Sequence, residues 1–168
     1  MNTIMESHND GEVWGLAIDD QNIFTVGDDN QVKKWDPFSR KSVETGKITD
    51  NENNAKDGQR GASTMGKHPE SQMGRALAIS VNGDLCICAC DGNSYIRNTS
   101  DLHTDIAVLD HSTRWIEVAE YSPDGSLLAV GSHDTNIYIY DVNDGYSLRG
   151  KCSEHNASIT CIDFSMDG

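Results

Sequence analysis

A repeat with a period of 42 to 43 residues is the feature that most constrains the fold of this 168-residue chain. The segment Tyr121-Ser122-Pro123-Asp124-Gly125 returns 43 positions later at 164–168, and a similar segment at 79–83 precedes it by 42 positions. Upstream, Val26-Gly27-Asp28-Asp29 matches the residues from Val130 onward. Self-similarity at a fixed period indicates one supersecondary unit built several times, with the apolar faces of neighbouring copies buried against each other.

Each copy has the pattern of short β-strands. Ile137-Tyr138-Ile139-Tyr140 is β-branched and aromatic throughout, and Leu127 to Val130 is a continuous apolar run of strand length. Asp-Gly, Asn-Gly and His-Asp-Thr-Asn clusters bound these runs, as in antiparallel hairpins. With strands spaced about 8 to 12 residues apart, one period accommodates four of them. We therefore predict a series of four-stranded antiparallel sheets.

The repeats divide the chain into five predicted parts. They are a first unit at 1–40, a polar insertion or disordered loop at 41–73, a second unit at 74–110, a third at 111–152 and the start of a further unit at 153–168. The expected strands are Val13–Ile18, Ile23–Val26 and Val32–Trp35; Ala76–Val81, Leu85–Ala89, Ser94–Ile96 and Ile106–Leu109; Trp115–Tyr121, Leu127–Gly131, Ile137–Asp141 and Tyr146–Arg149; and Ile159–Phe164. The fourth strand of the first unit is left unassigned.

The segment 41–73 interrupts the period. Apolar residues are sparse in it, and glycines recur at Gly58, Gly61 and Gly66. Such a composition buries too little apolar surface to offset the entropy of ordering the chain, which predicts a long or disordered loop. A solvated insertion without a role and a loop that binds a partner or is phosphorylated are both compatible with this composition.

Several motifs of the repeat resemble WD40 repeats. They are the turn Ser122–Gly125, the turn Gly131-Ser132-His133-Asp134 and the dipeptide Trp35-Asp36, together with the period itself. The resemblance implies an all-β fold of WD40 β-propeller blades, each a four-stranded antiparallel sheet. The chain length then accounts for about three blades plus the first strand of a fourth, which is an incomplete propeller.

A closer resemblance is to the echinoderm microtubule-associated protein-like family. The segments that carry it are His8–Ala17, Asp101–Asp105, Glu120–Tyr140 and Gly150–His155. Their order and spread look like part of the C-terminal propeller of that family. The resemblance implies a non-catalytic scaffold for protein–protein interaction, with tubulin or microtubules as partners and a cytoplasmic location at the cytoskeleton. The alternative is a generic WD40 adaptor of another assembly, such as a ubiquitin ligase or a ciliary complex.

WD40 blades often contain a buried hydrogen-bond network of His, Ser or Thr, Asp and Trp, and the resemblance places such a network here. In the third unit the matching residues are His111, Ser132, Asp134 and Tyr140, with tyrosine where tryptophan is usual. In the first unit they are His8, Asp29 and Trp35, and Gly27 occupies the position expected for serine. The third unit therefore has the nearly complete set.

Four residues are candidates for contact with a partner. Trp14, Arg114 and Trp115 fall at or near the start of a first strand, and His133 lies in the turn between the second and third strands of its unit. In WD40 proteins this edge faces the binding rim, and aromatic and arginine side chains are common anchors of interfaces. Burial of Trp115 in the core is an equally good interpretation of its position.

The charge of the chain narrows the classes of partner. With 27 acidic and 13 basic side chains, the formal net charge is −14. Nucleic-acid binding needs clustered Lys and Arg, and so does attachment to an anionic membrane, so we expect neither as a partner. The same charge opposes long-range approach to an acidic tubulin surface. No apolar run reaches the roughly 18 residues that would span a bilayer.

Catalytic, cofactor-binding and metal-binding residues are not predicted. Cys86, Cys88 and Cys90 alternate along one strand, so they share one face, and small buried hydrophobes explain them better than a soft-metal site without further ligands. The Asp-rich turns lack the spacing of calcium loops, and hydrolase and phosphate-loop motifs are absent from the sequence. An enzyme with a site in the central channel therefore ranks behind the two scaffold functions.

Three blades and one strand do not close a ring, because propellers use four to eight blades. We expect either that the sequence belongs to a longer chain or that another chain supplies the remaining blades.

Overall fold

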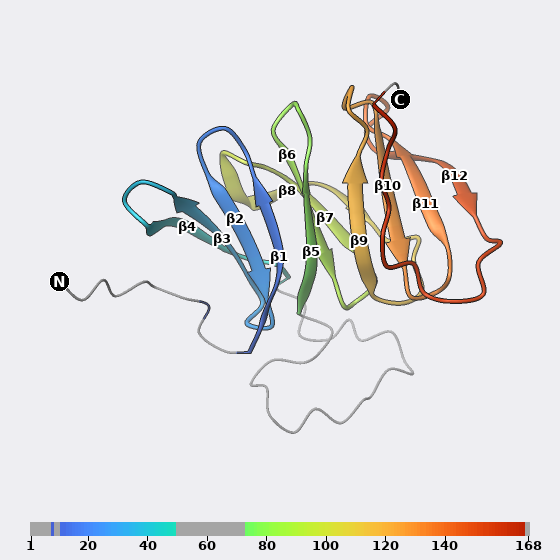
Figure 1. The fold of residues 1–168 in the computed structure, drawn as a ribbon, viewed down its shortest axis with the longest axis horizontal. Helices are drawn as coiled ribbons and strands as arrows, with labels where there is room; N and C mark the ends of the chain where they lie inside the picture. The colour runs from blue at the N-terminus through green and yellow to red at the C-terminus, as the bar shows by residue number, and fades with distance from the viewer. Residues whose placement is uncertain (1–7, 9–10, 50–72, 167–168) are drawn as a thin grey trace.

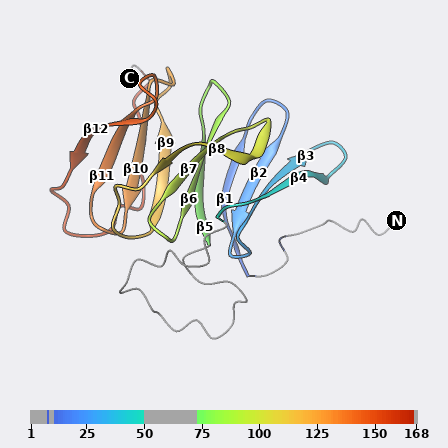
Figure 2. The same cartoon turned by 180° about the vertical axis from the view of Figure 1, so that it is seen from behind.

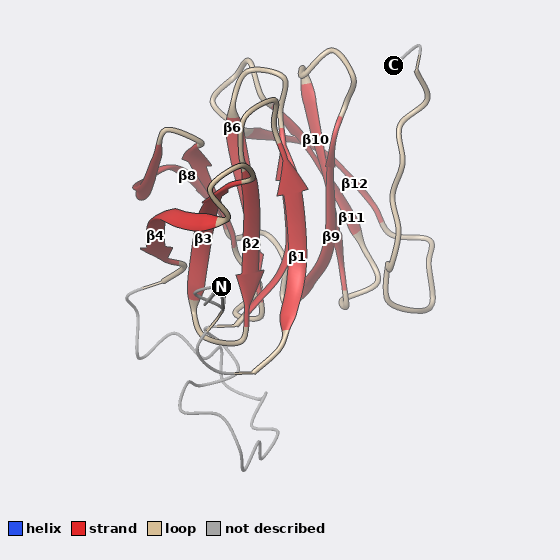
Figure 3. Ribbon diagram, turned by 60° about the vertical axis from the view of Figure 1, so that its left-hand side comes forward, coloured by secondary structure: helices blue, strands red, loops and turns tan. Residues whose placement is uncertain are grey.

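The computed structural model describes residues 8, 11–49 and 73–166, and the regular structure in these residues consists of β-strands alone (Figures 1 and 3). The described part of the chain therefore has no helix long and apolar enough to span a bilayer. Most of the predicted insertion, residues 50–72, lies outside the described residues.

Twelve strands form three four-stranded antiparallel sheets, which we call blades one to three. Blade one contains β1 (Val13–Ile18), β2 (Ile23–Gly27), β3 (Gln31–Asp36) and β4 (Lys41–Lys47). Blade two contains β5 (Gly74–Ile79), β6 (Asp84–Ala89), β7 (Ser94–Asn98) and β8 (Asp101–Leu109). Blade three contains β9 (Ile116–Tyr121), β10 (Leu127–Ser132), β11 (Ile137–Asp141) and β12 (Ser147–Cys152). The predicted fold class is confirmed.

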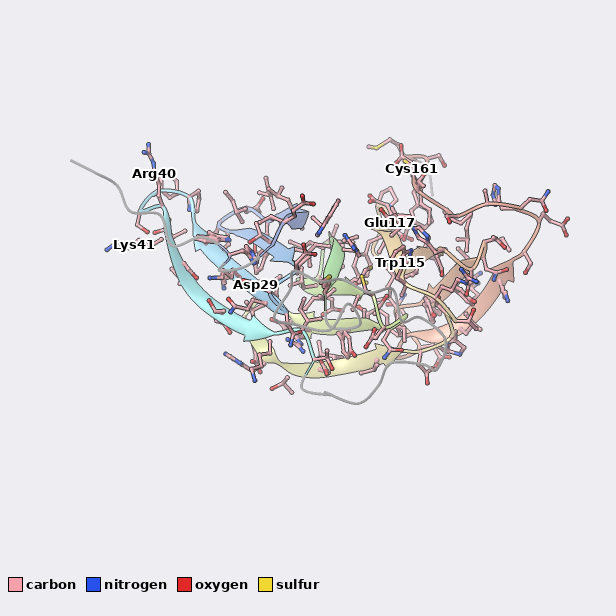
Figure 4. All side chains as sticks on the ribbon, turned by 90° about the horizontal axis from the view of Figure 1, so that it is seen from below. Asp29, Arg40, Lys41, Trp115, Glu117 and Cys161 are labelled. Atoms are coloured by element: carbon pink, nitrogen blue, oxygen red, sulfur yellow. The ribbon has the colours of Figure 1, made fainter. Side chains whose placement is uncertain are left out.

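Within each blade the strands pair in sequence order, as hairpins of consecutive strands must. The blades stand side by side in an open arc, with their first strands β1, β5 and β9 packed against one another (Figures 1 and 2). The fourth strands β4, β8 and β12 lie on the outer side of the arc (Figure 4). The concave side is therefore formed by the first strands.

Two layers of buried side chains hold the blades together. The first lies between blades one and two and includes Phe24, Leu85 and Ile87, all fully buried. The second lies between blades two and three and includes Cys86 and Cys88. Because side chains alternate across a strand, β6 contributes to both layers, and its cysteines pack as the small apolar groups that we predicted.

Glycine allows the first strands to approach closely. A Cβ atom on Gly15 of β1 would lie 2.7 Å from Val26 Cγ2 and 3.0 Å from the carbonyl carbon of Ala76 in β5. No side chain fits in that space. The hairpins between first and second strands use glycine differently: Gly83 and Gly125 have φ of 84° and 71°, as expected for their Asn-Gly and Asp-Gly turns.

The predicted boundary between blade one and the insertion is wrong at residue 40. The structure places strand β4 at Lys41–Lys47, paired along β3 from Gln31 to Asp36. It is an edge strand of mostly polar residues, four of whose seven residues are exposed, so its sequence lacks the apolar signature of a strand. Gly46 is its one buried residue, and a Cβ there would lie 2.3 Å from Leu102 O of blade two.

The strand predicted at Ile159–Phe164 is also not formed. Residues 153–165 have no regular structure, although Ile159 donates its backbone N–H to Ser132 O at 3.2 Å. The Ile159 side chain is 6% exposed and lies where a Cβ on Gly131 would meet it at 2.6 Å. Ile159 thus contacts β10 of blade three, but in the described part of the chain residues 153–165 do not form a strand ladder with it.

Candidate functional site

A β-bulge recurs near the start of the first strand of every blade. The register shifts between Val13 and Gly15 in β1 and between Gly74 and Ala76 in β5, and it shifts in β10 opposite the same part of β9. The extra residues are Trp14, Arg75 and Glu117, one per blade. Bulges turn a side chain out of the regular alternation, and they are common beside functional sites.

Each bulge is held by the same backbone hydrogen bond. The amides of Asp28, Cys90 and His133 donate to the carbonyl oxygens of Glu12, Met73 and Trp115 at 3.0, 2.9 and 3.0 Å, respectively. The turns that donate these bonds connect the second and third strands, so turns and bulges share one edge of the arc, which we call the rim. In Figure 4, which views the arc from below, Asp29 and Trp115 lie on either side of the green β5.

Three side chains from three blades stack along this rim. The guanidinium of Arg75 lies 4.4 Å from the ring centroid of Trp14 and 5.5 Å from that of Trp115. Both distances are within the range of cation–π attraction. Trp14 is 47% exposed and donates from Nε1 to Asp28 Oδ1 at 2.8 Å. The sequence analysis named both tryptophans, and the structure adds Arg75, which lies between them.

The stack continues on blade three. The rings of Trp115 and His133 meet edge to face with centroids 4.7 Å apart. His133 Nε2 lies 3.1 Å from Glu117 Oε2, and its Nδ1 lies 3.1 Å from Ser158 Oγ. Figure 4 shows Trp115 and Glu117 together near the concave side of the arc. Arg114, the fourth candidate from the sequence, directly precedes this group and is exposed.

The blade network predicted from the sequence is most complete in blade one. His8 Nδ1 lies 2.7 Å from Asp29 Oδ1, and His8 Nε2 lies 2.8 Å from Thr25 Oγ1. Trp35 donates from Nε1 to the same Thr25 oxygen at 2.8 Å. These contacts form one continuous chain of hydrogen bonds from Asp29 through His8 and Thr25 to Trp35. The hydroxyl comes from Thr25, two residues before the Gly27 position at which the sequence analysis sought it.

In blade three the four predicted residues form two separate groups. His111 and Tyr140 make one, with 3.4 Å between Nδ1 and the hydroxyl oxygen. Ser132 and Asp134 make the other, joined through Ser112, whose Oγ lies 2.7 Å from Ser132 Oγ and donates to Asp134 Oδ2 at 3.2 Å.

The strand register equates Thr25 of β2 with Val130 of β10. Ile23 pairs with Trp35 in blade one as Leu128 pairs with Tyr140 in blade three. Two residues further along, the hydroxyl of blade one is replaced by an aliphatic side chain. Blade three therefore lacks the hydroxyl that bridges histidine and aromatic residue in blade one, and His111 and Tyr140 face each other directly instead.

Asp134 is instead the centre of a local hydrogen-bond network. It accepts from the Thr113 amide at 2.9 Å, from the Tyr138 hydroxyl at 2.8 Å and from the Asn136 amide at 3.1 Å. Partial burial acts to raise the pKa of Asp134, but these hydrogen bonds outweigh it and hold that pKa well below its usual range. Burial and the neighbouring carboxylate together raise the pKa of Tyr138 to about 12.

Blade two repeats the Asp–Tyr pair but not the aromatic residue. Tyr95 donates to Asp91 Oδ2 at 2.5 Å, as Tyr138 does to Asp134. Arg97, opposite Leu85, occupies the position of Trp35 and Tyr140 and is 4% exposed. It donates to Asp105 Oδ1 at 2.6 Å, to Ile48 O at 2.8 Å and to the carbonyls of Lys47 and Leu102. This arginine therefore fastens the end of β4 to blade two.

The described residues contain no group of three or more His, Cys, Asp and Glu side chains arranged to hold a metal ion. What they present on the rim is a row of aromatic and cationic side chains, suited to contact with another molecule. Arg75 and Thr25 are the residues that sequence reasoning missed. A register aligned on the bulges and turns, rather than on a constant period, would have found both.

Comparison with known proteins identifies the family. Residues 13–168 match the family model described as the second β-propeller of echinoderm microtubule-associated protein. The chain belongs to the echinoderm microtubule-associated protein family. It is 34% identical to the 77 kDa echinoderm microtubule-associated protein of Strongylocentrotus purpuratus, over 99% of this chain and 22% of that protein. It is 44% identical to the ciliary WD repeat-containing protein ctxp80 of Euplotoides octocarinatus, over 98% of this chain and 23% of that protein.

The chain thus spans less than a quarter of the length of these two relatives. Among solved structures, it resembles a chain of the mitotic checkpoint complex with a TM-score of 0.66 and 16% identity, over 88% of this chain and 39% of that one. At that identity the likeness shows the fold alone. Family and fold together indicate the WD40 propeller type, whose members typically serve as interaction scaffolds.

Proposed function

We propose that this chain is part of a non-catalytic WD40 scaffold that associates with microtubules or tubulin at the cytoskeleton, in the cytoplasm. The observation that carries the proposal is the match of residues 13–168 to a propeller of a microtubule-associated family. The rim supports it, because Trp14, Arg75 and Trp115 are the residue types that anchor protein interfaces. With a net charge of −14, neither nucleic acid nor a membrane is among the proposed partners.

Co-sedimentation with polymerised tubulin tests this function. The full chain is expected to pellet with the polymer in proportion to polymer concentration, and a surface capture assay is expected to detect unpolymerised tubulin. Retention in the supernatant at every polymer concentration, together with no capture of tubulin, would contradict the proposal. The variant Arg149→Gln removes one charge from the exposed outer strand β12 and serves as a control for nonspecific ionic binding.

A second candidate is an adaptor of a ciliary assembly. The observation that favours it is the 44% identity to a protein named as a ciliary WD repeat-containing protein. Proximity labelling by the tagged chain in ciliated cells distinguishes the two candidates. Labelled tubulin spread along cytoplasmic microtubules favours the first, whereas labelled proteins confined to cilia, with little tubulin, favour the second.

A further inference from the structure

Arg75 is held in place on the rim with most of its hydrogen-bonding capacity unused. Its Nε donates to Cys90 Sγ at 3.1 Å, and its guanidinium is stacked between Trp14 and Trp115. Among the described residues, neither Nη1 nor Nη2 of this arginine has a hydrogen-bond or ion-pair partner. Two terminal nitrogens with four N–H groups are therefore presented between two indole rings.

A second donor beside it also lacks an acceptor. Trp115 Nε1 is buried and has no hydrogen-bond partner among the described residues. Buried polar groups are usually paired, so an unpaired one next to an unpaired guanidinium calls for an explanation. Both groups are donors, so the site is suited to a ligand that accepts hydrogen bonds.

Two carboxylates of the rim are engaged elsewhere. Asp28 accepts from Trp14 Nε1 and from the Glu12 amide at 2.8 and 2.9 Å, and Glu117 lies 3.1 Å from His133 Nε2. Arg114, exposed on the same rim, adds a second cationic side chain. The net charge of −14 acts against an anionic ligand only at long range, because salt screens exposed charges beyond about 8 Å at physiological ionic strength.

We propose that Arg75, clamped between Trp14 and Trp115, binds a side-chain carboxylate of an acidic peptide segment in the partner protein. A guanidinium matches a carboxylate with two parallel hydrogen bonds, which neither an amide nor a cationic side chain does. The bulge of β5 directs this arginine to the rim, and stacking on two rings orients the fork before the ligand arrives. The inference rests on the proposed function of the rim as a partner-binding surface, and it names the chemistry of the partner.

The test uses fluorescein-labelled hexaglutamate with an amidated C-terminus and fluorescence anisotropy with the full chain. Hexaglutamate is expected to bind and to quench the fluorescence of Trp14 and Trp115. Arg75→Gln is expected to weaken binding about tenfold or more, since a charge-assisted pair is lost. Arg75→Lys keeps the charge but not the forked pair of donors, so its affinity for hexaglutamate is expected to lie between those of the parent chain and Arg75→Gln. Arg149→Gln, with the same loss of charge on exposed β12, is expected to bind within twofold of the parent chain.

Several results would overturn the proposal. One is equal affinity of Arg75→Gln and Arg149→Gln for hexaglutamate. Another is tighter binding of hexalysine than of hexaglutamate by the parent chain. A third is that the parent chain binds hexaglutamine with a free C-terminal carboxylate but does not bind the amidated hexaglutamate. Circular dichroism of each variant checks that the blades are intact, and Arg75→Lys decides the matter if Arg75→Gln does not fold. The function proposed above fails separately. If tubulin binds Arg75→Gln as tightly as the parent chain, the carboxylate site is refuted and the scaffold function stands. If the parent chain binds hexaglutamate but not tubulin, the scaffold function is refuted and the carboxylate site stands.

Discussion

Blades one and three have different side-chain networks at equivalent positions of their second and third strands. In blade one, Thr25 accepts from Trp35 and contacts His8, so the loop before the first strand, the turn and two strands are joined by side chains. In blade three, Val130 stands at the position of Thr25, and the Tyr140 hydroxyl lies 3.4 Å from His111 without a shared partner. Blade three thus lacks the bridging hydroxyl, and among the described residues His111 is not hydrogen-bonded to the turn aspartate as His8 is in blade one.

Blade three compensates within its turn. The carboxylate of Asp134 gathers donors from Thr113, Asn136 and Tyr138, and Ser112 connects it to the second strand. The turn aspartate is the constant element of the network, because Asp29, Asp91 and Asp134 all take part in its hydrogen bonds. The partners of that aspartate vary from blade to blade.

Removing the aspartate of blade three should have the largest effect. Asp134→Ala leaves the Tyr138 hydroxyl and the Thr113 and Asn136 amides without an acceptor, so it is expected to lower the free energy of unfolding by about 3 kcal/mol. Urea unfolding followed by circular dichroism measures this change. Asp20→Ala, at an exposed position, is the control, and similar losses in the two variants would contradict the assigned role.

Protonation of the same carboxylate should cost less than its removal. The hydrogen bonds lower the pKa of Asp134 in the folded chain below the ordinary value of 3.8, so the stabilisation is full above that value and is lost as pH falls below it. Protonation of Asp124 destabilises the folded chain in the same direction, because hydrogen bonds, first that from Ser122, lower its pKa to about 2. Urea unfolding at pH 5 and near pH 2.5 is expected to show this loss, and Asp134→Asn is expected to show less of it. If the free energy of unfolding of Asp134→Asn fell between pH 5 and pH 2.5 as much as that of the parent chain, the interpretation would be refuted.

The sequence predicts most of the fold because the apolar runs of the second and third strands are strong. Strands such as Ile137–Asp141 lie where they were expected. Strand β4 was missed because its residues face water, and a polar edge strand has the composition of a loop. Ile159–Phe164 was assigned as a strand because the repeat places the first strand of a further unit there, although a strand also needs a neighbour to pair with.

Part of the site was beyond the reach of a constant period. The turns between first and second strands differ in length, since Ile18 pairs with Ile23, Ile79 with Leu85 and Tyr121 with Leu128. From one blade to the next, the number of residues between equivalent positions in the first and second strands therefore increases by one. That shift concealed the equivalence of Trp14, Arg75 and Glu117. Thr25 was missed for a related reason, because the hydroxyl of the network was sought at the position of Gly27.

Loss of the hydroxyl from blade one is the next prediction by size. Thr25→Val keeps the shape of the side chain but leaves His8 Nε2 and Trp35 Nε1 without a partner, and it is expected to lower the free energy of unfolding by about 2 kcal/mol. Thr160→Val, at an exposed position, is the matched control. Equal stability of the two variants would show that the network of blade one contributes little.

The smallest effect should come from giving blade three the chemistry of blade one. Val130 is fully buried, so Val130→Thr alone adds a hydroxyl without an assigned partner and is expected to cost about 1 kcal/mol. Tyr140→Trp places an indole N–H diagonally across the strand pair from position 130, as Trp35 lies diagonally across from Thr25 in blade one. In the double variant the indole and the new hydroxyl should pair, so the two substitutions should couple favourably by about 1 kcal/mol in a double-mutant cycle.

The cycle with Tyr140→Phe in place of Tyr140→Trp separates pairing from packing, because phenylalanine has no N–H to donate. Coupling confined to the tryptophan cycle would mean that one strand position and its aromatic neighbour are sufficient to convert the network of blade three into that of blade one. Equal coupling in both cycles would mean that the added hydroxyl finds its hydrogen-bond partner elsewhere. His111 Nδ1, which lies 3.4 Å from the Tyr140 hydroxyl in the parent chain, loses that contact in both variants and becomes available. In that case the histidine before the first strand, and not the aromatic residue, would be the partner that the hydroxyl selects.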